Sequence, residues 1–213
     1  MAGNDAVLDF RGLVGTIRSI HNEFASQAVR AVNVCLTLRN WLIGCYIAEF
    51  QLRGTDRAAY GERLFDELAS ALRKHGVSSS GRRQLYGYLA FYRTYPQIVQ
   101  SLPAQSRGLV PLPASHVEKV RSLTAQSATP ADELVQKLSY THIEQLVALD
   151  HPLQRSFYEA ECIRGAWSVR ELKRQIGSLY FERSGLSKHP SKLAELVQAG
   201  AETSDSRLVI RDP

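Results

Sequence analysis

The stretch from Phe24 to Leu52 constrains the fold most, because it predicts a helix that is apolar on most of its sides. One stripe of this helix carries Val29, Val32, Leu36, Ile43, Ile47 and Phe50. Other faces carry further apolar residues, among them Ala31, Leu38 and Cys45. Such a helix is either central to a bundle or shared with a partner chain. We favour burial within the chain over a dimer interface, because burial is the commoner cause of this pattern.

The remaining apolar periodicity also predicts helices, with few of the strict alternations that indicate strands. An amphipathic stretch covers Val7 to Asn22, and a helix with apolar residues spaced by fours covers Asp56 to His75. Gly76 stands where a C-terminal cap glycine is expected. A further helix runs from Arg82 to Tyr95 and is stopped by Pro96. We therefore predict an all-α protein, a multi-helix bundle over residues 1–100.

The second half predicts a separate helical unit after a connector. Residues 101–130 are rich in proline and serine, which is typical of a linker. Residues 131–199 are predicted to form three helices and a fourth short one: Tyr140–Leu149, Leu153–Arg164, Ser168–Arg183 and Ser191–Gln198. Residues 200–213 are expected to be a tail or a connector to a C-terminal domain that this chain lacks.

Two helix pairs with turns between them predict two helix-turn-helix-like units. The first joins the Asp56–His75 helix to the Arg82–Tyr95 helix through a glycine-containing turn. The second lies within 131–199 and ends in the helix that starts at Ser168. Ser168 and Glu171 have the spacing of a capping box, which is the best helix-start signal in the chain.

Charge is distributed unevenly along the chain. Between Glu67 and Glu118 lie fifty residues without an acidic side chain, and the whole formal net charge of +5 resides there. Unopposed lysine and arginine side chains are what phosphate contacts require. DNA is therefore the predicted partner.

Seven residues are the candidate DNA contacts. Arg82, Arg83, Tyr86 and Arg93 lie on one predicted helix, and Arg170, Lys173 and Arg174 lie on another. The face with Arg83, Gly87, Ala90 and Thr94 lies opposite the apolar stripe, which suits a helix against a DNA groove. Tyr86 is the best candidate for stacking on a base. The alternative for each basic cluster is a solvated helix face, which Glu171 and Glu182 favour for the second.

Several other classes of function find no support in the residues. Arg39, Asn40 and Glu49 interrupt the most apolar run, so no membrane span is predicted. No secretory signal is visible, and a cytoplasmic location is expected. The cysteines and histidines have no metal-ligand spacing, and no glycine-rich phosphate loop or G-x-S-x-G motif is present. We therefore expect no metal, no cofactor and no catalytic residue.

The order of several segments resembles one known family. They are Ala31-Val32-Asn33, Trp41-Leu42-Ile43-Gly44, Tyr60-Gly61, Leu138-Ser139-Tyr140-Thr141-His142, Phe157-Tyr158-Glu159, Trp167 through Ile176, Tyr180-Phe181-Glu182-Arg183 and Leu186-Ser187-Lys188. They resemble the N-terminal domain of YhcG-type proteins, which are bacterial and associated with mobile elements and defence loci. The resemblance covers nearly the whole chain, and Trp167 to Lys188 is its most specific part.

The resemblance implies a helical domain that is usually followed by a PD-(D/E)xK nuclease domain. Such a nuclease holds Mg²⁺ with strand-borne acidic residues. The only Glu-x-Lys here, Glu171-Leu172-Lys173, falls in a predicted helix, where capping explains Glu171 better.

We therefore predict a non-catalytic module that binds DNA and targets a nuclease supplied in cis or in trans. The alternative is a dimerisation or protein-interaction module that docks a nuclease or toxin through the apolar helix 24–52.

Overall fold

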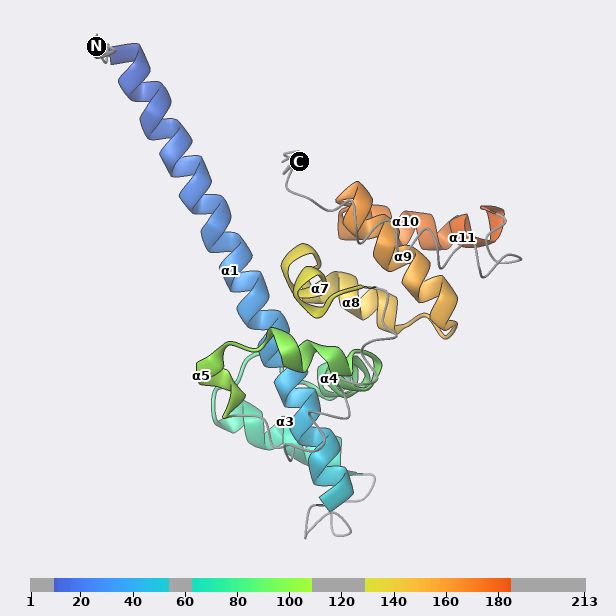
Figure 1. The fold of residues 1–213 in the computed structure, drawn as a ribbon. Coiled ribbons are helices and arrows are strands. Elements are labelled where there is room, and N and C mark those ends of the chain that lie inside the picture. Colours follow the sequence, from blue (N-terminus) through green and yellow to red (C-terminus); the bar gives the residue numbers. More distant parts are fainter. Residues whose placement is uncertain (1–9, 54–62, 109–128, 185–213) are drawn as a thin grey trace.

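The structure, a computed structural model, describes residues 10–53, 63–108 and 129–184 (Figure 1). Within these ranges every regular element is a helix, so the predicted all-α class is confirmed. The elements are α1 (Phe10–Arg53), α3 (Leu64–Lys74), α4 (Arg82–Thr94), the 3-10 helix η2 (Pro96–Ser101), α5 (Ala104–Arg107), α7 (Ala131–Lys137), α8 (Tyr140–Val147), α9 (Pro152–Gly165), α10 (Val169–Gly177) and α11 (Tyr180–Arg183).

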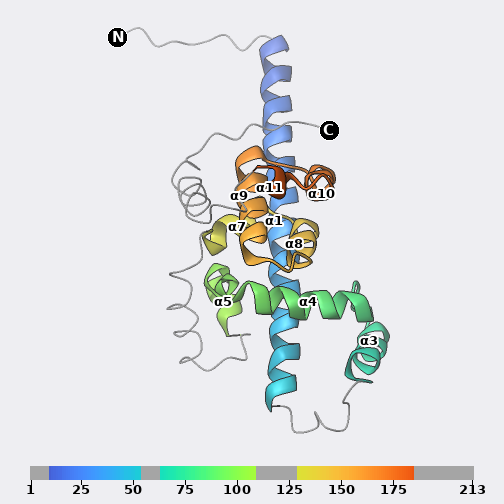
Figure 2. The same cartoon turned by 90° about the vertical axis from the view of Figure 1, so that its right-hand side faces the viewer.

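Helix α1 is the axis of the molecule. It has 44 residues, which corresponds to a length of about 66 Å at 1.5 Å per residue. The two helices predicted over residues 7–22 and 24–52 are one helix in the structure, because no proline interrupts the chain between them. Its C-terminal half runs through the helical body, and its N-terminal half projects from it (Figures 1 and 2).

The larger core surrounds the C-terminal half of α1. Trp41 is completely buried, and its indole Nε1 donates a hydrogen bond to the carbonyl oxygen of Tyr95 at 2.9 Å. Residues from both halves of the chain, including Ile98, Leu146 and Leu172, belong to the same core. The interpretation of α1 as a core helix is therefore confirmed for residues 37–49, where burial is nearly continuous. The two predicted units share this core.

Helix α4 crosses α1 at Gly44. A Cβ atom at Gly44 would lie 1.9 Å from the carbonyl oxygen of Tyr88, so only glycine permits this approach. A second, smaller core forms beside the crossing, where Phe65 of α3 and Leu85 of α4 pack with Ile47 of α1. Helix α4 thus packs against α1, α3 and α8.

Glycine and proline predicted the helix ends well. Gly76 has a φ of 70°, and the amide of Val77 donates to the carbonyl of Leu72, which closes the cap of α3. Helix α4 ends before Pro96, as predicted. Sequence periodicity missed α7, and it missed the break between α10 and α11 at Leu179, whose φ is 54°.

Residues at both ends of the predicted linker 101–130 are packed against the helical body. Leu102 is buried in the larger core, and Thr129 is buried beside α7. Residues 109–128 lie outside the described residues, as do the predicted helix 191–198 and the tail 200–213. The division of the chain into 1–100 and 131–199 stays a prediction.

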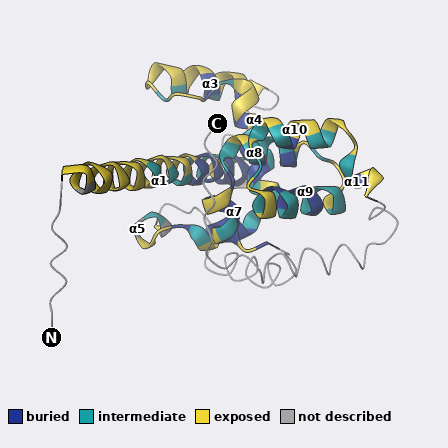
Figure 3. Ribbon diagram, turned by 90° about the horizontal axis from the view of Figure 1, so that it is seen from above, coloured by how far each residue is buried: buried dark blue, intermediate teal, exposed yellow. Residues whose placement is uncertain are grey.

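The N-terminal half of α1 is exposed along its length (Figure 3). Val29 and Val32 of the predicted apolar stripe are 62% and 58% exposed, although the sequence favours burial for the helix over residues 24–52. They are exposed because the described body packs only against α1 from Val34 onward. The chain itself covers most of Leu38 to Glu49. The predicted docking of a partner through residues 24–52 can therefore use only the residues of this helix that are exposed.

Helix α1 also meets a length and composition criterion for crossing a membrane, over Leu13–Leu52. The charged and polar residues of the helix, in contrast, predict no membrane span. The core helix of a soluble protein meets the same criterion, and the most apolar window of α1 is 44% buried in the fold. From Ala31 to Ala48 the only charged residue is Arg39, so the apolar part largely coincides with the part that packs. Cytoplasmic location stays a prediction.

Candidate nucleic-acid interface

Helices α8, α9 and α10 form a three-helix unit in which each helix packs against the other two. Residues 166–168 are the turn between α9 and α10. Ala166 has a φ of 45°, and the amide of Trp167 donates to the carbonyl of Cys162, which ends α9. A turn of three residues thus joins α9 to α10.

His142 of α8 fixes the position of this turn. Its Nδ1 accepts a hydrogen bond from the Ser139 amide at 3.3 Å, so Nε2 carries the proton and donates to the carbonyl of Trp167 at 3.0 Å. Burial lowers the pKa of His142, and the bond to Trp167 partly opposes this shift. The neutral ring is therefore the folded form, and its contribution to stability is present above pH 6.5 and is lost as the pH falls. The Ser-x-x-His spacing is the sequence signal for this cap.

Substitution of His142 by alanine is expected to lower the free energy of unfolding by about 1–2 kcal/mol at pH 7.5, because the Ser139 amide and the Trp167 carbonyl lose their partner. Urea denaturation followed by circular dichroism measures it. His151→Ala, at an exposed histidine that makes no side-chain cap, is the matched control and is expected to stay within about 0.5 kcal/mol of the parent. Equal effects of the two changes would contradict the role of His142.

Helix α10 presents the predicted basic residues on its outer face. Arg170, Lys173 and Arg174 are all exposed, while Leu172 is completely buried and anchors the opposite side. Ser168 caps the helix by accepting from the amide of Glu171 at 3.2 Å, so the Ser168 half of the predicted capping box is confirmed. The Glu171 carboxylate bonds Arg174 and Gln175 instead of completing the box. Among the described residues, no ion pair involves Arg170 or Lys173.

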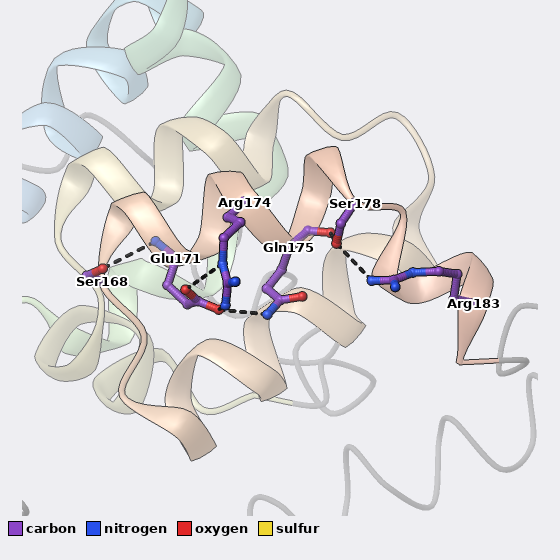
Figure 4. A network of polar contacts seen from close by, with 6 residues as sticks. All are labelled: Ser168, Glu171, Arg174, Gln175, Ser178 and Arg183. Atoms are coloured by element: carbon purple, nitrogen blue, oxygen red, sulfur yellow. Dashed lines mark hydrogen bonds and ion pairs between the residues drawn. The ribbon is translucent and has the colours of Figure 1, made fainter.

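Arg174 is less available than its neighbours (Figure 4). Its guanidinium bonds both carboxylate oxygens of Glu171, at 2.7 and 3.0 Å, and Gln175 donates to the same carboxylate. The bonds from Arg174 and Gln175 lower the pKa of Glu171, so this carboxylate stays charged. Arg183 of α11 was missed as a candidate and donates to the Ser178 hydroxyl at 2.9 Å, beside the end of α10 (Figure 4). From Val169 to Arg183 the chain has four basic and two acidic residues.

The candidate residues of α4 are partly engaged within the chain. Arg82 forms an ion pair with Asp66 of α3 at 2.9 Å. The sequence window between Glu67 and Glu118 contains no acidic residue, but the fold brings an acidic side chain from outside the window next to it. Arg93, at the other end of α4, donates to the side chain of Gln51 on α1 at 3.1 Å. Arg83 is exposed, and no ion pair is found for it among the described residues.

The proposed groove-facing side of α4 requires correction. Gly87 is half-buried, and a Cβ atom there would lie 2.9 Å from the hydroxyl of Tyr140, because α8 packs over this face. The turn before α4 covers residues 75–81, which is longer than the three or four residues of a helix-turn-helix. Tyr86 is 43% exposed, but its ring stacks on Phe65 with 3.7 Å between centroids, so one face is unavailable to a base.

The described residues contain little else that suggests a reactive site. An apolar groove of about 860 Å³ lies between α1 and α3, with Ile43, Tyr46 and Leu68 in its lining and few polar groups among them. No cluster of three or more potential metal-ligating side chains is found in the described part of the chain. Neither feature has the convergent polar groups of an active site.

The described residues form an all-helical domain in which α10 presents exposed basic side chains. The chain belongs to the DUF1016 N-terminal domain family, whose model matches residues 16–183. A protein of Escherichia coli (strain K12) named "Putative nuclease YhcG" is 32% identical over 192 residues, which are 88% of this chain and 50% of that protein. The chain thus spans about half the length of this curated relative, and the resemblance to YhcG-type N-terminal domains is confirmed. No solved structure matches the chain.

Proposed function

We propose that this domain binds duplex DNA and so targets a nuclease, and that α10 is the helix that meets the DNA. The observation that carries the proposal is the exposed Arg170 and Lys173 on the outer face of a capped helix that follows a three-residue turn. If α9 and α10 act as a helix-turn-helix, α10 is the second helix, which lies in the major groove with its N-terminal residues in contact with the base edges. Arg170 lies in the first turn of α10, and Lys173 lies in the next.

The chemistry of the face fits phosphate contacts with limited base reading. Arg170 and Lys173 can bond phosphate oxygens or the O6 and N7 of guanine. Arg183 adds a further cation near the end of α10. Arg83 is a separate exposed cation at the start of α4. Glu171 opposes phosphate, but its charge is compensated by Arg174. Affinity is therefore expected to depend steeply on salt.

We propose further that cleavage is not performed by the residues described here. The E. coli relative, which is named "Putative nuclease YhcG", is about twice as long as the matched region. Glu171 and Lys173 lie on a helix, and Glu171 is bonded to Arg174 and Gln175 rather than directed to a metal site. A PD-(D/E)xK centre requires its acidic residues on strands around Mg²⁺. The role that fits this chain is delivery of the nuclease to DNA.

The decisive experiment measures binding of the chain to a fluorescent duplex by anisotropy across a salt series. The variant Arg170→Glu/Lys173→Glu is expected to weaken binding at least tenfold and to reduce the slope of log K against log salt by about 2. These two side chains are preferred over Arg174 because their replacement breaks no ion pair in the described structure. Arg83→Glu alone tests the contribution of α4, since changing Arg82 would also remove its pair with Asp66.

The control is Arg73→Glu/Lys74→Glu, which changes the net charge equally at two exposed residues at the end of α3. It is expected to change affinity by less than about threefold, because residues away from the contact act only through long-range charge. If both double variants lose the same affinity, the α10 proposal is wrong and binding reflects net charge. If the parent shows no salt-dependent binding, DNA is not the partner.

A further inference from the structure

The projecting half of α1 carries an apolar seam with the spacing of a coiled coil. Its residues alternate in steps of three and four, at the a and d positions of a heptad: Phe10, Leu13, Ile17, Ile20 and Phe24. These side chains are between 38% and 81% exposed. Isolated exposed apolar residues need no explanation, but a continuous row over about four turns does.

The same heptad register continues into the buried half of α1. After Gln27 and Ala31, the a and d positions are Val34, Leu38, Trp41 and Cys45. All four belong to the larger core or pack directly against it. The seam is thus one pattern along the whole helix, packed by α4, α7 and α8 at one end. At the projecting end the described part of the chain supplies nothing to pack against it.

We propose that the projecting seam pairs with the same seam of a second copy, as an antiparallel two-stranded coiled coil. In the register that places a opposite d, Ile17 meets the partner's Ile20 at the centre. Leu13 then meets the partner's Phe24, and Phe10 meets the partner's Gln27. A two-fold axis between Ile17 and Ile20 makes the patch self-complementary, as a closed dimer requires. This inference goes beyond DNA binding and does not depend on it.

The antiparallel direction follows from where the body lies. Because the seam continues into the core, the body occupies the side of α1 on which a partner helix must lie. In a parallel pair both bodies would compete for that space at the same end. In the antiparallel register the partner helix ends opposite Gln27, before Val34 begins to pack in the core. The exposed part of the seam is therefore as long as the segment over which the two antiparallel helices would overlap.

The size and charge of the seam also fit a second copy. At about 200 Å² for each large side chain, the exposed fractions imply roughly 1,000 Å² buried by the a and d residues of two copies, which reaches the size of a specific interface. The flanking positions e and g would bring Val14 opposite the partner's His21, and Thr16 opposite the partner's Glu23. Neither pairing brings two carboxylates or two guanidinium groups together.

A lipid surface is a poorer occupant of this seam. The projecting segment has four charged residues, Arg11, Arg18, Glu23 and Arg30, within about six turns. These charges lie outside the a and d positions, which leaves a narrow stripe rather than the wide apolar face of a membrane-bound helix. A narrow stripe is the pattern of a coiled-coil seam.

The test is the mass of the full chain in solution, measured by size exclusion with light scattering over a range of concentrations. The parent is expected to be a dimer, and Ile17→Glu/Ile20→Glu is expected to be a monomer with dimer affinity at least a hundredfold weaker. Both side chains are exposed in the single chain, so their replacement leaves the body folded, which thermal circular dichroism verifies. Ser19→Glu/Asn22→Glu, on the opposite side of the same segment, is the matched control and is expected to stay dimeric.

Disulfide trapping tests the direction of the pair. In a Cys35→Ser background, which removes an exposed thiol, Leu13→Cys and Phe24→Cys chains are mixed and oxidised. The antiparallel coil predicts the mixed 13–24 product, whereas a parallel coil gives 13–13 and 24–24 products and overturns the proposed direction. A monomeric parent overturns the dimer. The seam would instead be assigned to lipid if the parent is monomeric and floats with anionic phospholipid vesicles, and if Ile17→Glu/Ile20→Glu abolishes this flotation.

Discussion

Gly44→Ala is expected to lower the free energy of unfolding by about 3 kcal/mol or more, which is a large fraction of the stability of an ordinary domain. The new methyl group would lie 1.9 Å from the Tyr88 carbonyl oxygen and 2.5 Å from its carbonyl carbon. Both are backbone atoms in the middle of α4, so a rotamer change cannot relieve the clash. The helices must separate, which removes contacts of Trp41 and Leu85 in both cores.

Gly15→Ala provides a control with the same chemical change in the same helix. No atom lies within 4 Å of a Cβ placed at Gly15, and alanine has the higher helix propensity. This variant is expected to raise the stability of the projecting segment by roughly 0.5–1 kcal/mol and to leave the unfolding of the body unchanged. Urea titrations of both variants, followed by circular dichroism, compare them directly. A loss below about 1 kcal/mol for Gly44→Ala would mean that the crossing is looser than described.

The sequence predicted elements where local chemistry decides the outcome. Gly76 and Pro96 ended helices as expected, and Ser168 capped α10, because caps and breakers act within one turn. The sequence predicts two helices where the structure has the single helix α1, since continuity through residue 23 depends on the absence of any strong breaker. The burial of α1 could be predicted for only half of its length. Hydrophobicity identifies a surface that needs a partner, but it does not say whether the same chain supplies one.

The sequence predicts the exposure of candidate residues that depends on a single helix. It does not predict the contacts that form where two helices meet. Arg170, Lys173 and Arg174 share an exposed face, as helical periodicity predicted. The pair of Arg82 with Asp66 joins α3 to α4, and Asp66 lies just outside the window that lacked acids. The Tyr140 hydroxyl over Gly87 comes from α8, more than fifty residues away in the sequence. Periodicity within a single helix contains no information on such neighbours.

A buried carboxylate connects the two halves of the chain. Glu159 of α9 is 6% exposed and accepts a hydrogen bond of 2.5 Å from the hydroxyl of Tyr95, at the end of α4. Burial raises the pKa of Glu159 to about 7, although the bond from Tyr95 and the charge of Arg155 oppose the shift. Burial and the adjacent Glu159 likewise raise the pKa of Tyr95. Between about pH 4.5 and pH 7, Glu159 therefore binds more protons in the folded protein than in the unfolded chain.

This difference predicts a loss of stability as the pH rises. The ordinary pKa of the carboxyl group is 4.5, and the folded value is about 7, so the contribution of the protonated group is fully present below pH 4.5. It is lost progressively as the pH rises through about 7, and the total corresponds to roughly 3 kcal/mol. His142 acts in the opposite direction, since its contribution is lost as the pH falls below 6.5. The stability of the parent therefore depends on pH through the summed contributions of Glu159 and His142.

Glu159→Gln isolates the contribution of the carboxyl group. Glutamine keeps an acceptor for the Tyr95 hydroxyl but cannot ionise, so the variant is expected to gain roughly 3 kcal/mol relative to the parent between pH 4.5 and pH 8.5. Urea denaturation at intervals of half a pH unit measures the two stability curves. Asp132→Asn, which removes one negative charge from an exposed position, controls for net charge. Curves for Glu159→Gln and the parent that stay parallel would show that Glu159 ionises in the folded protein as it does in water, and that burial does not hold its proton.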